Sequence, residues 1–445
     1  MAQIEKVRVH LQTLTPLHIG GSEGSLSPLQ FAHCNGKVYV ISPERWADWL
    51  RQNNAVENFI TYVKEKGKYA SLQEYLTSKN RGWFKPEILA LLAKYTVESA
   101  SAPTGDLRPF IRNGYQQPYI PGSAIKGALR TAILFAYLKE LKRQALSQFK
   151  NLVEEPIRAV LADRTLSLKD KKASLGHQLT PNFFQSFILG GAKKGPHKDL
   201  FKTISIADVS MQPFDKNTLI VEEVKVLSLD ATQPDGWRYS TGRQSRRERN
   251  PGDKRPYPQG GFSLFSECLL PNVPPAQLTV EVRFDVEMFE RFREEQRQGN
   301  PVMSLRQFIL KKAAELFPNQ PLDGKALVKT LVTLAEQSAQ HWVQEEIAFF
   351  STIENVAPIL ALYQDPTFRP TLRLGWGAGI KGITMYTLLP NDIQDEIKKI
   401  FMILLAPDAL RKYPSEFAVF PKTRRVIVRH GLPESVLGWV HLEVL

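Results

Sequence analysis

The 445-residue chain has only two cysteines, Cys34 and Cys268, and contains no long apolar run. The cysteines are far apart in the sequence and lack the spacing of zinc ligands, which argues against a disulfide framework and against a zinc site. The first ten residues, MAQIEKVRVH, lack the apolar core of a secretory signal. No segment approaches the roughly 18 apolar residues that a membrane-spanning helix requires. We therefore expect a cytoplasmic protein that does not contact a membrane.

The motifs of common enzyme classes are also missing. The eight histidines are scattered, and the chain contains no H-E-x-x-H metal motif, no G-x-S-x-G nucleophile elbow and no P-loop. Gly377, Gly379 and Gly382 match the spacing of a dinucleotide-binding loop, but we predict a strand rather than a helix after them, over residues 383–388. We expect no metal and no other cofactor.

Positive charge, by contrast, is abundant. Lysine and arginine total 58 against 45 acidic residues, which gives a formal net charge of +13. This balance favours an anionic partner, either a nucleic acid or an acidic protein surface.

Residues 118–130, P-Y-I-P-G-S-A-I-K-G-A-L-R, predict a helix whose N-terminus binds an anion. Ser123 is a suitable N-cap, and apolar residues follow at helical spacing to about residue 150. Lys126 faces the positive end of the helix dipole, and Gly127 costs about 1 kcal/mol relative to alanine. Both are explained if a phosphate approaches the backbone closely and also contacts Arg130. Alternatively, Gly127 lets another element pack closely and both cations are solvated.

Alternating strand-like and helical segments indicate an α+β fold. Residues 7–14 alternate as a half-buried strand, and Asn35-Gly36 is the preferred dipeptide of a type I′ hairpin. Helix-start signals occur at Ser42-Pro43, Ser71 with Glu74, Ser304 and Asp323. We divide the chain into an N-terminal half at 1–150 with a helical insertion at 43–97, a helical connector at 151–200, a strand-rich unit at 201–290, a helical insertion at 291–365 and a glycine-loop and strand unit at 366–445.

Two further segments predict contact with RNA. The loop at 237–261 is rich in arginine and carries Trp237, Tyr239 and Tyr257, which suits the stacking of unpaired bases. The glycine-rich segment beside Arg373 and Lys381 could line an RNA backbone with its own N–H groups. The alternatives are a solvated loop in the first case and a sterically tight connection in the second.

Three residues are candidates for RNA cleavage instead. His18, at the end of the first strand, could act as a general base on a 2′-OH. Asp106 and Asp208 could support in-line or metal-assisted cleavage. A structural role is the more common one for each, because such histidines are more often hydrogen-bonded structural residues or simple RNA contacts, and such aspartates more often cap helices or form salt bridges.

Five segments, in this order, resemble the RAMP superfamily of CRISPR-associated proteins. They are T-P-L-H-I-G-G at 15–21, Y-I-P-G-S-A-I-K-G-A-L-R at 119–130, I-S-I-A-D at 204–208, R-L-G-W-G-A-G-I-K-G at 373–382 and F-P-K-T-R-R at 420–425. Together with the C-terminal L-G-W-V they are most similar to the fifth Csm subunits of type III-A effector complexes. The resemblance spans nearly the whole chain except the helical insertions. One departure is G-G-S-E-G after the first strand, where members commonly have G-S-G.

The resemblance implies a ferredoxin-like (RRM-type) RAMP core, in one or two halves, interrupted by the large helical insertions. It also implies a noncatalytic subunit, acting in antiviral defence, that binds the crRNA, caps the backbone filament at the crRNA 3′ side and is needed for maturation of the crRNA 3′ end. Its implied partners are the crRNA, the other Csm subunits, especially the backbone RAMP subunit, and host nucleases. In this family the target-cleaving aspartate belongs to a different subunit, so no catalytic role is transferred to Asp106.

Residue patterns and resemblance together predict a set of RNA-binding residues. It comprises His18, Gly20, Gly21, Ser123, Lys126, Gly127, Arg130, Arg373, Gly375, Gly377, Gly379, Lys381, Gly382, Arg424 and Arg425. Two alternatives stay open: a RAMP-type endoribonuclease that processes CRISPR RNA, and a protein-only scaffold subunit.

Overall fold

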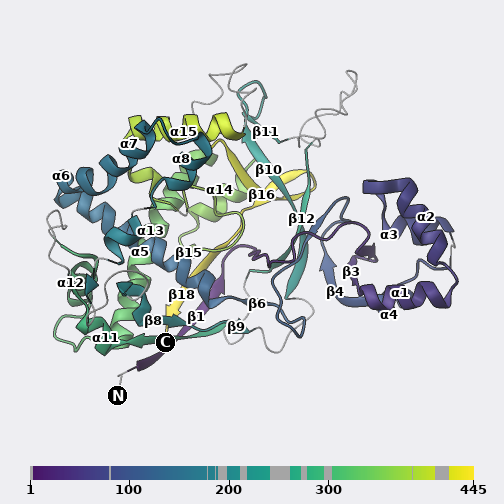
Figure 1. The fold of residues 1–445 in the computed structure, drawn as a ribbon, viewed down its shortest axis with the longest axis horizontal. Helices are drawn as coiled ribbons and strands as arrows, with labels where there is room; N and C mark the ends of the chain where they lie inside the picture. Colours follow the sequence, from purple (N-terminus) through teal and green to yellow (C-terminus); the bar gives the residue numbers. More distant parts are fainter. Residues whose placement is uncertain are drawn as a thin grey trace.

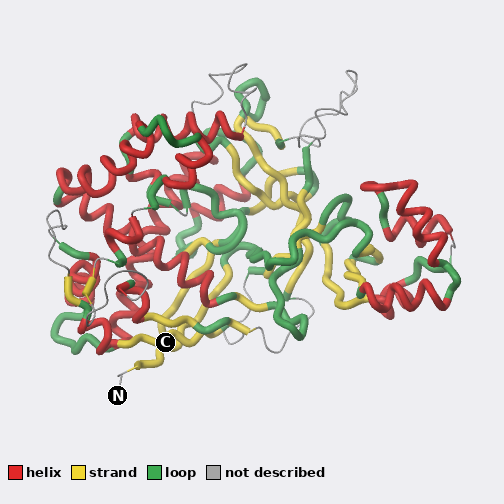
Figure 2. Tube along the Cα trace, viewed as in Figure 1, coloured by secondary structure: helices red, strands yellow, loops and turns green. Residues whose placement is uncertain are grey.

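The computed structural model describes residues 4–79, 82–177, 179–185, 187–188, 198–210, 218–240, 261–271, 278–294, 303–382, 384–405 and 420–445. These residues form a mixed α+β structure with two curled sheets in its middle, most of the helices on one side and a small helical lobe on the other (Figures 1 and 2). No helix in these ranges is long and apolar enough to cross a membrane.

The first sheet has the strand order β15-β18-β1-β13-β8, with every neighbouring pair antiparallel. The strands are β15 (Leu372–Arg373), β18 (Trp439–Val444), β1 (Ile4–Thr13), β13 (Thr279–Asp285) and β8 (Ile204–Ile206). The predicted alternation of β1 is confirmed, because Val7, Val9 and Leu11 are buried while Arg8 is exposed. In register, Val9 lies opposite Val280 on one side and Val444 on the other.

Two long helices, α5 (Gly122–Gln144) and α13 (Gly324–Phe350), pack against each other and against this sheet. Their apolar faces share one core with Val7, Val9 and Leu11. A buried hydrogen bond of 2.8 Å from Ser338 Oγ to the Ala132 carbonyl joins the two helices. Asp323 caps α13 by accepting the Ala326 N–H, as its sequence predicts.

The second sheet is built around the long strand β10 and has the order β17-β16-β10-β4-β3-β2, with β11, β12 and β5 paired beside that path. Its strands are β2 (Phe31–Cys34), β3 (Lys37–Ile41), β4 (Ala93–Ser99), β5 (Leu107–Arg108), β10 (Leu219–Leu229), β11 (Trp237–Tyr239), β12 (Leu264–Leu269), β16 (Thr423–Arg429) and β17 (Leu432–Ser435). The predicted hairpin is confirmed: Asn35 and Gly36, between β2 and β3, have φ values of 51° and 71°.

The helical lobe is inserted between β3 and β4 and contains α1 (Pro43–Gln52), α2 (Val56–Lys66), η1 (Gly67–Tyr69), α3 (Leu72–Lys79) and α4 (Pro86–Leu92). Ser42 caps α1 by accepting the Arg45 N–H, and Pro43 follows as the first helical residue. Trp46, Tyr75 and Leu89 belong to a core of its own. The helices end at Leu92 rather than at residue 97, because β4 begins at Ala93.

The remaining elements cover the sheets or extend their edges. The helices are α6 (Leu146–Phe149), η2 (Lys150–Glu154), α7 (Glu155–Ala162), α8 (Leu168–Ser174), α9 (Leu179–Phe183), η4 (Leu200–Thr203), α11 (Val286–Arg291), α12 (Leu305–Leu316), α14 (Ala357–Gln364), η6 (Tyr386–Leu388) and α15 (Asn391–Leu405). Two short pairs are β6 (Tyr119–Ile120) with β9 (Val209–Ser210) and β7 (Phe187–Ile188) with β14 (Arg293–Glu294). Ser304 caps α12, as its sequence predicts, and forms a capping box with Gln307.

Candidate nucleic-acid interface

The loop after β1 and the glycine loop after β15 are in direct contact. The Trp376 N–H donates a hydrogen bond of 2.9 Å to the His18 carbonyl. Gly375 has a φ of 68°, and a Cβ at this position would lie 2.1 Å from the same carbonyl oxygen. Only glycine therefore lets the two loops approach this closely. Segments 15–21 and 373–382, which the sequence marks separately, thus lie against each other.

Two arginines lie against the Trp376 ring. The guanidinium carbon is 4.8 Å from the ring centroid for Arg108, on β5, and 4.4 Å for Arg425, on β16. Burial, together with the nearby Arg108 charge, lowers the pKa of Arg425. Among the described residues neither arginine forms a salt bridge with an acid, although both are partly exposed. We call Arg108, Trp376 and Arg425 the Trp376 cluster; its two unneutralised charges favour an external anion.

His18 packs against the Trp376 ring of this cluster from inside the protein. Its side chain is only 2% exposed, and its ring packs edge-on against Phe110 and Trp376. The Nδ1–H donates a hydrogen bond of 2.8 Å to the Glu267 carbonyl. Burial lowers the pKa of His18 to about 4, so the ring is neutral at physiological pH. The histidine is enclosed rather than presented to a substrate.

Three of the cations predicted to bind RNA are instead paired with acids of α13. Arg373 and Arg424 both bind Glu346, at 3.3 and 2.7 Å, and all three side chains are buried. Lys381 binds the neighbouring Glu345 at 2.6 Å. These ion pairs fasten the glycine loop and β16 to α13, and contact of the three cations with RNA stays a prediction.

The N-terminus of α5 differs from its prediction. The helix begins at Gly122, and Ser123 is exposed and does not cap it. The cap comes instead from Asp208, whose Oδ1 accepts the Gly122 N–H at 2.8 Å. The Ser123 N-cap is therefore wrong, because a side chain from a distant loop takes its place. Asp208, one of the cleavage candidates, has this structural role.

The cations of α5 are also engaged within the chain. Lys126 Nζ donates to the Ile204 carbonyl at 2.7 Å. Arg130 forms a bidentate ion pair with Asp199, at 2.9 and 2.7 Å, and its guanidinium lies 3.8 Å from the centroid of the Phe184 ring. Beside them, Gly127 is exposed, and apart from its chain neighbours and the backbone of its own helix no described atom lies within 4 Å of where its Cβ would be. The described part of the chain therefore does not use Gly127 for close packing.

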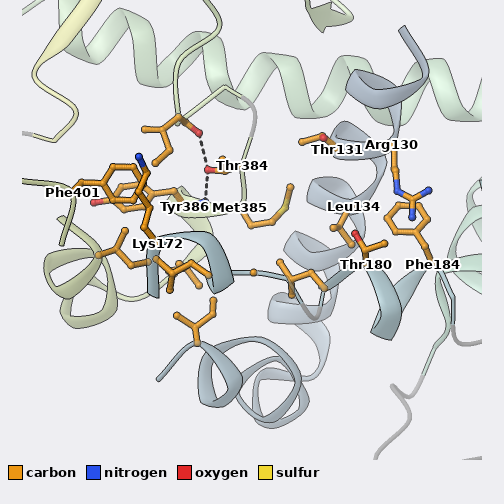
Figure 3. Close-up of a pocket in the computed structure, with 17 residues that line it drawn as sticks. Arg130, Thr131, Leu134, Lys172, Thr180, Phe184, Thr384, Met385, Tyr386 and Phe401 are labelled. Atoms are coloured by element: carbon orange, nitrogen blue, oxygen red, sulfur yellow. Dashed lines mark hydrogen bonds between the residues drawn. The ribbon is translucent and has the colours of Figure 1, made fainter. Parts of the chain in front are cut away.

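The segment of α5 and the glycine loop converge at a cavity of about 380 Å³. Arg130 and Ile380, which follows Gly379, both contribute to its lining, and Figure 3 shows Arg130 stacked on Phe184 at one end.

The predicted RNA-binding glycines differ in exposure. Gly20, Gly21 and Gly379 are exposed, whereas Gly377 and Gly382 are buried. A Cβ at Gly377 would meet Leu437 at 2.8 Å, so this glycine serves internal packing.

Two expectations about aromatic residues and local structure are wrong. Trp237 and Tyr239 are fully buried, with Trp237 Nε1 donating to the Glu354 carbonyl at 2.8 Å, so they cannot stack on bases. Tyr257 and most of the basic loop at 237–261 lie outside the described residues. The strand predicted over 383–388 is absent from its described part, where Tyr386–Leu388 form the 3₁₀ helix η6.

Residues 10–308, more than half of the chain, match the family model of the RAMP superfamily. The chain belongs to the RAMP superfamily. Two curated relatives are each described as "CRISPR system Cms protein Csm5". The one from Methanocaldococcus jannaschii is 24% identical over 455 aligned positions, covering 99% of this chain and 89% of the relative. The one from Streptococcus thermophilus is 25% identical over 223 residues, covering 48% of this chain but only 54% of that protein.

Solved structures also resemble this RAMP protein over nearly its full length. One is a chain of the cryo-EM structure of a Csm–crRNA–target RNA ternary complex of a type III-A CRISPR-Cas system, with a TM-score of 0.59, 18% identity and coverage of 99% and 100% of the two chains. Another is the crystal structure of T. onnurineus Csm5, with a TM-score of 0.55, 18% identity and coverage of 98% and 100%. These likenesses show a shared fold.

Sequence reasoning missed two residues of the candidate interface in this RAMP protein, Arg108 and Trp376. A signal for Trp376 was present, since a large aromatic residue stands between two glycines in G-W-G. Arg108 gave no comparable signal, because its place beside Trp376 depends on the parallel pairing of β5 with β12.

Proposed function

We propose that this chain is a noncatalytic crRNA-binding subunit of a type III-A (Csm) CRISPR effector complex. The observation that carries the proposal is the Trp376 cluster: two partly exposed arginines without an acidic partner among the described residues, held on one aromatic ring beside a glycine loop. The similarity to proteins named Csm5, and to a chain of a Csm–crRNA–target RNA complex, supports crRNA as the RNA that this chain binds.

The chemistry of the cluster suits an RNA backbone. Guanidinium groups bind phosphate through two parallel hydrogen bonds, and stacking on an indole holds them in position without neutralising them. The exposed Gly20, Gly21 and Gly379 leave room for a strand to approach the backbone. The enclosed His18 and the capping role of Asp208 do not favour the endoribonuclease alternative.

We further propose that the subunit acts in the cytoplasm at the 3′ side of the crRNA, where it caps the backbone filament, contacts the backbone RAMP subunit and is needed for trimming of the crRNA 3′ end by host nucleases. For the fold we propose a ferredoxin-like half. The chain order β1-α5-β8-β13-α13-β18 and the sheet order β18-β1-β13-β8, with α5 and α13 packed on the sheet, support it.

The test is the double variant R108A/R425A, with the exposed Arg8→Ala as a matched control. We expect affinity for a crRNA oligonucleotide to fall about tenfold for each lost contact, since hydrogen bonds to charged groups contribute roughly 1.5–3 kcal/mol. The slope of log K against log salt concentration should become less steep by roughly 1 for each lost phosphate contact. Filter binding at several salt concentrations measures both.

Effector complexes assembled with the double variant should also contain crRNA with longer, untrimmed 3′ ends. Arg8→Ala should change neither affinity nor crRNA length. A folded double variant with unchanged affinity and salt slope would exclude the Trp376 cluster as an RNA site. A chain that recovers protein partners but no RNA would favour the scaffold alternative.

A further inference from the structure

We propose that the cavity between α5, α9, α15 and the glycine loop binds one unpaired nucleobase of the RNA strand that crosses the Trp376 cluster. The proposal rests on the RNA-binding function proposed above and names a second subsite of it. Its grounds are the lining of the cavity, its charge and its position along the chain.

The cavity, of about 380 Å³, is lined mainly by apolar side chains and has a cation on an aromatic ring at each end. At one end Arg130 lies on Phe184, and at the other Lys172 lies 4.9 Å from the centroid of the Phe401 ring. Figure 3 shows these two pairs apart, with Leu134 and Met385 between them. Apolar and aromatic walls of this kind bind bases that are splayed out from a single strand.

The charge of the lining suits a nucleotide. No acidic residue is among the described residues that line the cavity. Asp199 neutralises Arg130, but the exposed Lys172 forms no salt bridge in the described part of the chain. Lys172 can therefore attract a phosphate while the apolar interior takes the uncharged base.

Hydroxyl groups provide for the polar edge of a base. Thr180 is exposed on the cavity rim, and no described residue hydrogen-bonds its side chain. Thr131 Oγ1 donates to the Gly127 carbonyl at 3.1 Å and keeps its acceptor lone pairs. Both lie on the side of the cavity formed by α5 and α9, near Arg130 (Figure 3).

The cavity lies close along the chain to the Trp376 cluster. Ile380 and Met385 in its wall belong to the segment that continues directly from Trp376. Ile380 is four positions after Trp376, so the two residues are at most roughly 14 Å apart along the backbone. A strand that contacts the cluster can thus reach the cavity within a few nucleotides.

The experiment combines single abasic substitutions along a crRNA oligonucleotide with a variant that blocks the cavity. Thr180→Trp fills the rim from an exposed position, and Ser147→Trp, exposed on α6, is the matched control. For the wild-type chain we expect one abasic position to lower affinity about tenfold, as base stacking contributes roughly 1–3 kcal/mol. In T180W, intact RNA should bind about as weakly as that abasic RNA, and the abasic substitution should have no further effect.

Controls separate this subsite from the Trp376 cluster. Ser147→Trp should keep the full abasic effect, and Arg425→Ala should weaken intact and abasic RNA by the same factor. Thermal unfolding confirms that T180W is folded, and Lys172→Glu offers a second, repulsive variant that should also weaken RNA binding severalfold.

The outcomes are distinct. If the arginine variants weaken RNA binding but T180W leaves every abasic effect unchanged, the nucleobase site is overturned while the proposed function stands. If T180W impairs assembly with other subunits and not RNA binding, the cavity takes a protein side chain and the inference falls. If wild-type chain binds no RNA, both fall together.

Discussion

Asp208 shows how a residue's role can depend on a contact that is distant in sequence. The local signal at residues 121–123 favours Ser123 as the helix cap, but the chain folds so that Asp208, 86 positions away, accepts the Gly122 N–H. Gly122 also permits the close approach, because a Cβ there would lie 2.0 Å from the Ile206 carbonyl oxygen. Local capping rules cannot detect an acceptor that tertiary packing supplies.

Replacing Asp208 separates capping from catalysis. Asp208→Ala removes the acceptor and should lower the free energy of unfolding by about 1 kcal/mol, the usual cost of losing an N-cap. Asp208→Asn keeps an acceptor, so its free energy of unfolding should fall by only a few tenths of a kcal/mol. Urea denaturation measures both. Equal losses in the two variants would contradict the capping role, and RNA cleavage that both abolish would reinstate the endoribonuclease.

The adjacent Arg424 and Arg425 illustrate a part of the candidate interface that the sequence could have predicted. Successive side chains of a strand point to opposite faces, so only one of two neighbouring arginines can face an RNA groove. In β16, Arg424 points to the buried Glu346 and Arg425 to Trp376. Which of the two is buried could not be predicted, because Glu346 lies 78 positions away on another element.

At the scale of elements, several predictions from local signals are confirmed, whereas the Ser123 cap and the strand over 383–388 are wrong. The Asn35-Gly36 hairpin and the Ser42 and Asp323 caps are confirmed. Trp237, by contrast, lies next to a basic loop in sequence but is buried in the core. The residues that follow Trp237 in the sequence indicate an exposed arm, and only the pairing of β11 with β10 places the Trp237 ring in the core.

Helix α13 holds β15 and β16 in place through the ion pairs of Glu346 with Arg373 and Arg424, so removing this carboxylate should be costly. Glu346→Gln leaves Arg373 and Arg424 buried without a counter-charge, so we expect a loss on the order of 3–5 kcal/mol. The adjacent Glu345→Gln breaks only the partly exposed pair with Lys381 and should lose at most about 1 kcal/mol. Denaturant unfolding of the two variants measures the difference.

The loss in Glu346→Gln should depend on pH. Burial alone would raise the pKa of Glu346, but Arg424 and Arg373 outweigh burial and hold the pKa below its ordinary value of 4.5. The stabilisation is therefore complete at neutral pH and is lost as the pH falls below about 4.5, through the lowered pKa. A difference between wild type and E346Q that stays constant down to pH 3 would contradict this account.

At the scale of the whole molecule, the helical lobe is built as a separable unit. Strand β3 lies between two hydrophobic cores. Its side chains Val38 and Val40 belong to the main core, whereas Tyr39 and Ile41 belong to the core of the lobe. The chain enters and leaves the lobe at adjacent positions, since Ile41 lies opposite Ala93 in the register of β3 and β4. No residue of helices α1 to α4 belongs to the main core as far as the structure describes it, and Figure 1 shows these helices apart from the rest of the chain.

Replacing residues 42–92 by Asn-Gly should convert β3 and β4 into a simple hairpin, because this dipeptide forms the two-residue turn that joins directly opposed strands. We expect the shortened chain to fold and to bind crRNA within about twofold of the full chain, since the Trp376 cluster lies outside the lobe. Circular dichroism and filter binding test this. Tyr39→Thr and Ile41→Thr, added to the deletion, remove the apolar side chains that it exposes. If this soluble variant still fails to fold or to bind RNA, the lobe is required by the main body rather than separable from it.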